Sequence, residues 1–439
     1  MDLFIGIAAA VFLLILSVVK NIYLVYPLIL IDLIFIGIFL RRGFKLKYLL
    51  SQAFKGGKKA FVVLQIFVLI GAITAVWMSS GTVPAIVFYG MRLLNPYIFI
   101  FSCFVLSAFV SMLIGTSFGT ASTIGIALII MARSGGISPE LAAGAIISGA
   151  LYGDRCSPMS SSANLVATLT GTDLFRNIKN MFKTAWLATL ITLGIYMIFS
   201  VFNPLNTSDS TIVFHIAKTF RTDLLVLLPA FIIIILSFFR VNVKLSMLVS
   251  IVAGFLISIF FQGYSFFEVL EFSVGGFFLE KDNPLFKIIS GGGILSMLKV
   301  ALIVFFSSTI TGLFEGTDAF SFIDKYMERV KTRSGTLFST IIVSIVSAVF
   351  GCTQVMAIIL TEQIVKKTYK KKNFDSYELA VDIENTAVVL SPLIPWNIAG
   401  LVPATTLGVT SGFIPFAFYL LVLPVVYYLN LWKKDRNIA

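Results

Sequence analysis

The run Gly153-Asp154-Arg155-Cys156-Ser157-Pro158-Met159-Ser160-Ser161-Ser162-Ala163-Asn164 interrupts an otherwise apolar segment, residues 139–175. As one straight helix this segment would be about 55 Å long, against roughly 30 Å of bilayer hydrocarbon. The polar run and its proline therefore predict a broken membrane helix. Residues 376–408 repeat the pattern, with Glu384-Asn385-Thr386 followed by Ser391-Pro392-Leu393-Ile394-Pro395-Trp396-Asn397.

The composition around these breaks is that of a membrane protein. Of 439 residues, 58% are hydrophobic and 12% are charged, and the mean hydropathy is +0.99. A soluble fold could not cover so much apolar surface with so few charges. Repeated apolar runs of about 20 residues predict an all-α polytopic protein in a lipid bilayer, rather than a barrel of strands.

The net charge of +12 comes from basic residues in short stretches between the apolar runs. Such stretches are typical of cytoplasmic loops, so we expect no nucleic-acid partner. They lie at 41–59, 176–183, 325–333, 366–372 and in the tail from Lys433. They predict about ten transmembrane helices, with both termini in the cytoplasm and the N-terminus as a first span rather than a cleaved signal peptide. The simple spans are expected at 3–19, 21–40, 60–78, 184–202, 222–240, 244–262, 298–314 and 411–431.

Two further apolar segments start and end on one side of the predicted membrane. Residues 95–132 are interrupted at Gly115-Thr116-Ser117-Phe118-Gly119-Thr120, and residues 334–365 at Gly351-Cys352-Thr353-Gln354. Each is either a pair of short spans or a re-entrant hairpin with its polar tip inside the bilayer. We predict re-entrant hairpins.

The order of these features repeats with opposite orientation. Gly115 and Ser157 are 42 residues apart, and Gly351 and Ser391 are 40 apart. The matching spans run in opposite directions, which is typical of inverted-topology repeats. We therefore predict a first repeat at 1–202, an external connector at 203–221 and a second repeat at 222–439. Residues 41–59 and 263–297 would be interfacial helices on opposite faces.

The breaks and hairpin tips are candidates for an ion or substrate site. Unwound backbone in a membrane needs polar partners, and transporters place it where an ion or solute binds. Asp154 and Glu384 would exchange a proton for a cation, and they are the candidate Na⁺ ligands. The other candidate site residues carry hydroxyl, amide or guanidinium groups: Thr116, Ser117, Thr120, Arg155, Ser157, Ser160, Ser161, Asn164, Thr353, Gln354, Asn385, Ser391 and Asn397.

Several charged residues also admit a structural interpretation. Asp154 and Arg155 could form an ion pair, and Glu384 could cap a helix end. We favour a structural role for Asp382 and an interhelical bond for Asp32. Glu362 lies near a predicted cytoplasmic loop, where we expect it to be solvated.

The sequence offers little for catalysis or cofactor binding. His215 and the three cysteines show no metal-ligand spacing, and no nucleotide, haem or flavin motif is present. We find no nucleophile–base pair and place His215 in the external connector. The sequence therefore predicts a transporter rather than an enzyme, without a bound cofactor.

The motifs resemble the NhaC-type sodium/proton antiporter family. The resemblance is carried by three stretches and spans most of the chain: residues 94–120, then Gly144-Ala145-Ile146-Ile147-Ser148-Gly149-Ala150 leading to Gly153-Asp154-Arg155-Cys156-Ser157-Pro158, and the later Ser391–Asn397 motif. It implies a scaffold with a mobile, elevator-type transport domain, a possible homodimer and transported Na⁺ and H⁺. It also implies the cytoplasmic membrane of a prokaryote.

Three positions depart from the family pattern. Ser161 stands where an acid is usual, Asn385 follows Glu384 where an aspartate is usual, and Arg155 stands where lysine is usual. The leading prediction is Na⁺/H⁺ antiport. The alternative is cation- or proton-coupled transport or exchange of an organic carboxylate or amino acid, because a guanidinium binds a carboxylate bidentately.

Overall fold

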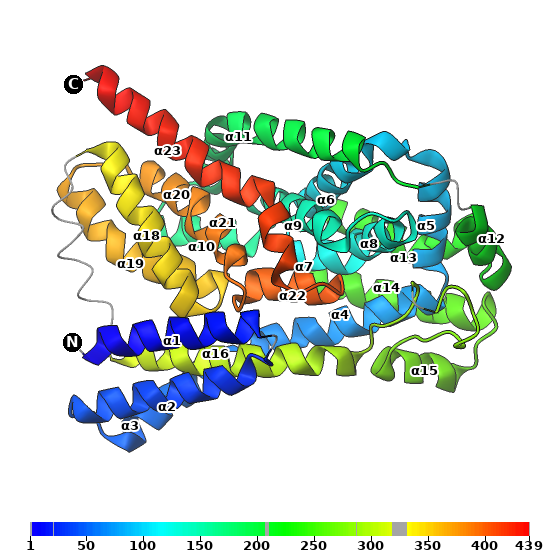
Figure 1. The fold of residues 1–439 in the computed structure, drawn as a ribbon, viewed down its shortest axis with the longest axis horizontal. Coiled ribbons are helices and arrows are strands. Elements are labelled where there is room, and N and C mark those ends of the chain that lie inside the picture. Colours follow the sequence, from blue (N-terminus) through cyan, green and yellow to red (C-terminus); the bar gives the residue numbers. More distant parts are fainter. Residues whose placement is uncertain (1, 21, 207–209, 287, 318–331, 439) are drawn as a thin grey trace.

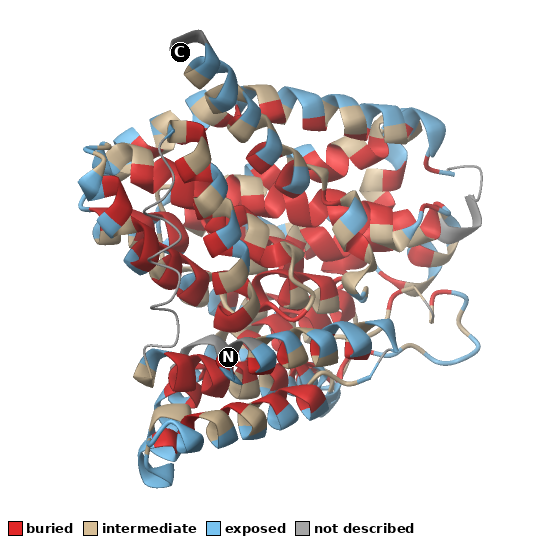
Figure 2. Cartoon of the chain, turned by 60° about the vertical axis from the view of Figure 1, so that its left-hand side comes forward, coloured by how far each residue is buried: buried red, intermediate tan, exposed pale blue. Residues whose placement is uncertain are grey.

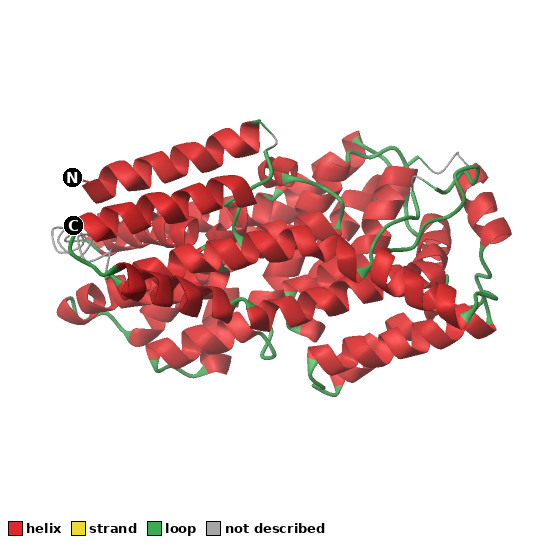
Figure 3. Ribbon diagram, turned by 90° about the horizontal axis from the view of Figure 1, so that it is seen from below, coloured by secondary structure: helices red, strands yellow, loops and turns green. Residues whose placement is uncertain are grey.

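The computed structural model describes residues 2–20, 22–206, 210–286, 288–317 and 332–438. These residues form helices joined by short loops, and their one β-bridge is an isolated pair, Phe277 with Gly291 (Figure 3). The predicted all-α class is confirmed. Lys325, Arg329 and Lys331 of the basic stretch at 325–333 lie outside the described residues.

The first half of the chain contains two interrupted segments at the predicted places. Residues 95–132 form α6 and then α7, a π-helical turn and α8, and residues 139–175 form α9 and α10 before the long α11. The helix bounds are α1 Asp2–Val19, α2 Val25–Arg41, α3 Leu46–Lys59, α4 Phe61–Ser79, α5 Thr82–Leu93, α6 Phe99–Ile114, α7 Ser117–Thr120, the π turn Ala121–Gly125, α8 Ile126–Ser134, α9 Pro139–Arg155, α10 Ser161–Thr170 and α11 Leu174–Phe202.

The second half also contains two interrupted segments. Helices α18 and α19 pack against each other around a turn at Cys352-Thr353, and residues 376–408 are interrupted twice, at Thr386 and at 394–397. The bounds are α12 Ser210–Thr219, α13 Leu228–Phe238, α14 Val243–Phe260, α15 Phe266–Gly275, α16 Leu298–Gly316, α18 Arg333–Gly351, α19 Gln354–Lys371, α20 Ser376–Asn385, α21 Ala387–Leu390, α22 Ile398–Thr406 and α23 Phe418–Ile438.

Two helices were not predicted. The flank 79–92 contains α5, and the connector 203–221 contains α12 with His215. Both follow or precede a sharp bend: α5 lies at 65° to the end of α4, and α12 lies at 96° to the segment Leu224–Phe238. Their apolar runs are shorter than a membrane span, so the hydropathy of the sequence did not indicate these helices.

Six described helices are long and apolar enough to cross a bilayer, and three bent pairs raise this number to as many as nine. The chain is therefore a multi-pass membrane protein. Both termini lie at the same end of the molecule, as Figures 1 and 3 show. Interfacial candidates α3 and α15 lie toward opposite ends of the lower layer in Figure 1.

Buried side chains form two large apolar clusters, which fill the middle of the helical bundle (Figure 2). The first core surrounds α6, α8 and α9, and the second surrounds α2, α16 and α18–α20. Each broken helix passes from one core to the other. Leu151 of α9 lies in the first core and Val166 of α10 in the second, whereas Val388 lies in the second and Val402 of α22 in the first. The polar breaks therefore lie where the two cores meet.

Small residues bring the helices around the first break into close contact. A Cβ added at Gly149 would lie 2.2 Å from the Phe104 carbonyl oxygen, and one at Gly153 would lie 2.2 Å from the Ala108 oxygen. Helix α9 therefore rests on the backbone of α6, as the small-xxx-small pattern does in membranes. This packing fixes the end of α9, where Asp154 and Arg155 stand.

Candidate functional site

The first break holds its carboxylate with hydrogen bonds. Helix α9 ends at Arg155, and the Ser160 hydroxyl caps the next helix by accepting the Ala163 N–H. Asp154 is 7% exposed and accepts the Ser117 backbone N–H at 3.0 Å. The Ser160 hydroxyl lies near enough to the same carboxyl to influence it. The tip of the first hairpin thus donates directly to the first carboxylate, which suits an ionised form.

Arg155 joins the first break to the second. Its fully buried guanidinium donates from Nη1 to the Tyr419 hydroxyl at 2.7 Å and from Nη2 to Oδ1 of Asn385. Nε has no partner among the described residues. Arg155 forms no ion pair with Asp154 in the described structure. The Asp154–Arg155 ion pair considered from the sequence is therefore not formed. The guanidinium instead points across to α20 and α23.

The second break is held by neutral groups. Asn397 caps α22 and donates from Nδ2 to the Ala348 carbonyl at 2.9 Å. Trp396 donates to the Val349 carbonyl at 2.9 Å, and Gln354 donates to the Val388 carbonyl at 2.9 Å. The second hairpin therefore binds its own broken helix, as the first does, but without a charged group.

Glu384 is the exception in this well-bonded region. It is 1% exposed, and neither carboxyl oxygen has a hydrogen-bond partner among the described residues. It lies close enough to Arg155 and Asp154 for their charges to act on it. No helix-capping bond accounts for it, so the capping role considered from the sequence is not the one found. An unpartnered buried carboxyl is costly unless it holds a proton or a cation.

Asp382, two residues earlier on α20, shows the opposite pattern. Arg333 pairs with it at 2.8 Å, the Tyr427 hydroxyl donates to it at 2.7 Å, and Tyr369 donates to its other oxygen. The structural role expected for Asp382 agrees with this geometry. Asp32 accepts the Thr309 hydroxyl of α16, which is the expected interhelical bond.

Most of the remaining predicted site residues bond to the backbone of the breaks and hairpin tips. Thr120 and Ser391 bond to carbonyls within their own helices, Ser157 accepts the Met159 N–H, and Thr353 caps α19. Thr116 lies at the first hairpin tip, where its carbonyl accepts from Thr120. Ser161 and Asn164 are exposed, and the Asn164 amide donates to backbone carbonyls of the break. These groups position the two breaks but do not gather around the carboxyls.

Other residues differ from the sequence analysis or were missed by it. Glu362 is buried and pairs with Lys366, so its predicted solvation is wrong; the reason is that the α18–α19 hairpin packs against α10. Tyr419 and Thr184 bond to Arg155 and Asn385 from α23 and α11. They stand in simple spans, where a lone hydroxyl gives no signal.

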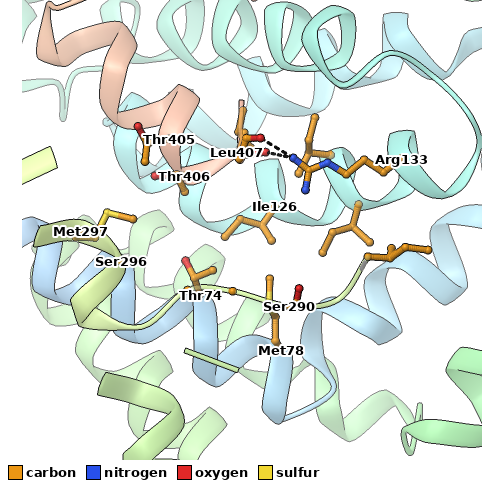
Figure 4. A pocket seen from close by; sticks show the side chains of 16 residues that line it. Thr74, Met78, Ile126, Arg133, Ser290, Ser296, Met297, Thr405, Thr406 and Leu407 are labelled. Atoms are coloured by element: carbon orange, nitrogen blue, oxygen red, sulfur yellow. Dashed lines mark hydrogen bonds between the residues drawn. The ribbon is translucent and has the colours of Figure 1, made fainter. Parts of the chain in front are cut away.

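A cavity of about 180 Å³ lies between the end of α8, the end of α22 and the loop before α16 (Figure 4). Arg133 donates from Nη2 to the carbonyls of Leu407 and Gly408 at 2.8 and 2.9 Å. Hydroxyls line the rest of its polar wall: Thr74, Ser290, Ser296, Thr405 and Thr406.

The described residues contain no group of three or more His, Cys, Asp or Glu side chains that could hold a metal ion. The site instead has two carboxyls and one guanidinium at helix breaks inside a polytopic membrane protein. This combination is typical of secondary transporters.

The chain belongs to the Na⁺/H⁺ antiporter family, which it matches over residues 3–163 and 149–431. It is 29% identical over 398 residues to the Na⁺/H⁺ antiporter NhaC of Alkalihalophilus pseudofirmus, covering 88% of this chain and 85% of that protein. It is 28% identical over 398 residues to the malate-2H⁺/Na⁺-lactate antiporter of Bacillus subtilis, with the same coverage. It is 28% identical over 405 residues to the arginine/ornithine antiporter ArcD of Halobacterium salinarum, covering 89% and 83%. The resemblance to the NhaC-type family is thereby confirmed.

Proposed function

We propose that this protein exchanges Na⁺ for H⁺ across the cytoplasmic membrane of a prokaryote, with both termini in the cytoplasm. The observation that carries the proposal is Glu384, a buried carboxyl without a partner, next to Asp154 and Arg155. Family membership supports the class of reaction, and the unpartnered carboxyl supports Glu384 as the exchanging residue.

The charges at the site make a proton and a cation mutually exclusive. With both carboxyls ionised, Asp154, Glu384 and Arg155 sum to one negative charge. One proton on Glu384, or one monovalent cation beside it, brings the sum to zero. A site with neither the proton nor the cation has a net negative charge in the bilayer interior. A site with both has a net positive charge. Either uncompensated charge is costly there.

The roles of the two carboxyls follow from their partners. Asp154 accepts from the Ser117 backbone N–H, and this hydrogen bond favours its anion. Glu384 has no such donor and is the group that exchanges. Its carboxyl oxygens are hard ligands, which suit Na⁺ better than a soft metal.

Transport of an organic carboxylate or amino acid is the second candidate. Two relatives carry such substrates in their names, malate and lactate in one and arginine and ornithine in the other. Arg155, however, already donates from both terminal nitrogens to Tyr419 and Asn385. A bidentate carboxylate would have to displace them, so the occupied guanidinium favours the cation. The Arg133 cavity supports the second candidate better, since Nη1 of Arg133 makes no hydrogen bond among the described residues.

Corresponding helix contacts in the two halves support an inverted repeat. Helix α2 packs on α16 and α14 packs on α4; α3 packs on α16 and α15 packs on α4. Likewise α11 packs on α6 and α23 packs on α18. We propose that the first four helices of each half form a scaffold and that the hairpins, broken helices, α11 and α23 form the moving part.

The experiment is proton movement in sealed proteoliposomes loaded with a pH dye. Pulses of NaCl, LiCl and KCl are compared between the wild type and Asp154→Asn, with Glu280→Gln, an exposed loop residue, as control. We expect a Na⁺-dependent pH change that Asp154→Asn abolishes and Glu280→Gln retains. The absence of any cation response in tight vesicles, with uptake of a hydroxy acid or amino acid instead, would favour the second candidate.

A further inference from the structure

A second, larger cavity of about 640 Å³, which neither Asp154 nor Glu384 lines, lies between α11, α20 and α23. It is at the end of the molecule where the C-terminus lies, since α23 runs toward that end (Figure 1). The first turns of α11 and α20 form two of its walls, and the last turns of α23 form the third.

The walls of this cavity carry an excess of positive charge. Five basic side chains line it, against two acidic ones. Both acids are already engaged, because Asp375 and Glu378 form the capping box of α20 and Glu378 also pairs with Arg333 at 3.5 Å. Arg333 is neutralised by Asp382 beneath it. The basic residues that form no ion pair with another described residue are Arg176, Lys183, Lys433 and Lys434.

One rim of the cavity faces the lipid. Trp186 lines it and is 59% exposed, as expected for an aromatic residue at the level of the headgroups. The outer face of α11 continues from Trp186 with exposed apolar side chains, Leu190 and Ile198, each 56% exposed. A molecule with its anionic end in the cavity could therefore lay an acyl chain along α11.

We propose that this cavity binds the phosphate of an anionic phospholipid. Basic pockets between transmembrane helices bind such headgroups, and the four unpaired cations supply the complementary charge. The exposed apolar side chains on α11 favour a lipid, because an acyl chain can pack against them and a soluble phosphate compound has no such chain.

The bound headgroup would lie one side chain away from the transport site. Thr184 lines the cavity, and its hydroxyl accepts from Nδ2 of Asn385 at 3.1 Å. The Oδ1 atom of the same amide accepts from Arg155. Lipid binding at this cavity does not depend on which solute the protein carries, so it can be tested independently of Na⁺/H⁺ exchange.

The test is titration of purified full-length protein in a neutral detergent with phosphatidylglycerol, with bound lipid counted by native mass spectrometry. The variant K183Q/K434Q removes two exposed lysines that form no ion pair among the described residues, and K45Q/K47Q removes two exposed lysines outside the cavity. We expect K183Q/K434Q to weaken binding about thirtyfold, because each lysine contributes about fivefold. The control variant is expected to bind as the wild type does.

Two further ligands separate the possible sources of phosphate. Phosphatidylcholine is expected not to compete, and glycerol phosphate is expected to compete only weakly. Equal binding of glycerol phosphate and the lipid would overturn the assignment of a lipid as the ligand. Equal weakening of lipid binding by both double variants would overturn the assignment of the lipid to this cavity. The single variants K183Q and K434Q, each expected to weaken binding about fivefold, test the same assignment if the double variant folds poorly.

Discussion

The two helix breaks have the same layout but differ in how their acidic residues are satisfied. At the first break, Asp154 accepts from the hairpin tip through Ser117. At the second, Asn397, Trp396 and Gln354 bind the hairpin, and Glu384 is left without a partner. Neutral side chains hold the second break together, so the carboxyl of Glu384 is not needed for a structural hydrogen bond. The same supersecondary unit can therefore hold one buried carboxyl by a hydrogen bond and leave another without a partner.

The largest expected effect belongs to Glu384. Replacing Glu384 by Gln removes the exchangeable proton but keeps the shape of the side chain. We expect Na⁺-driven proton movement to fall to the level of empty vesicles, with a melting temperature unchanged or higher, because no bond to the carboxyl is lost. Transport that persists in Glu384→Gln would remove the distinction between the two breaks.

Asp382→Asn is the matched substitution two residues earlier on the same helix. It leaves the partly buried Arg333 with a neutral partner in place of Asp382 and with Glu378 at 3.5 Å, and it weakens the bonds from Tyr369 and Tyr427. We expect a loss of about 3 kcal/mol of stability, as for other broken buried pairs. The folded fraction should retain transport, measured after size-exclusion chromatography and corrected for reconstituted protein. Loss of transport without loss of stability would move Asp382 into the exchange site.

The hairpin tips provide the next test. Gly115 has φ +74°, and a Cβ there would lie 2.5 Å from the Met159 Cβ at the first break. We expect Gly115→Ala to cost about 2 kcal/mol or more, from the left-handed backbone and from the contact with Met159. Gly171→Ala is the control, since its φ is +69° and no atom lies within 4 Å of the added Cβ. Equal losses of melting temperature would contradict the contact between hairpin and break.

The smallest effect is expected at the second tip. Cys352 occupies the position of Gly115 with φ +53°, although it has a side chain. Cys352→Gly relieves the left-handed strain but loses a buried thiol and adds some chain entropy to the unfolded state, so we expect it to be about 0.5 kcal/mol more stable than Cys352→Ala, which loses the same thiol. Cys352→Ala keeps the strain and serves as control. A lower melting temperature in the glycine variant than in the alanine variant would contradict this reading of the tip.

Much of this architecture could be predicted from the sequence. The interruptions at Gly115, Pro158, Cys352 and Pro392 are local signals, because backbone that leaves a helix inside a membrane requires glycine, proline or polar side chains. The burial of Asp154 and Glu384 followed from their position inside apolar segments.

What the sequence could not provide is which groups meet across the fold. Tyr419 reaches Arg155 from 264 residues away, and a single hydroxyl in an apolar span gives no pattern to read. For the same reason the neighbours Asp154 and Arg155 were candidates for an ion pair, although the guanidinium points to another helix. Ser161 was grouped with the site by its spacing, but α10 turns it outward.

The most direct test of the central claim measures proton release when Na⁺ binds. Na⁺ is titrated into purified protein in weakly buffered detergent with a pH indicator, with choline chloride as the ionic-strength control. We expect saturable proton release from the wild type and none from Glu384→Gln. Saturable Na⁺ binding without proton release, or release that persists in Glu384→Gln, would contradict the central claim.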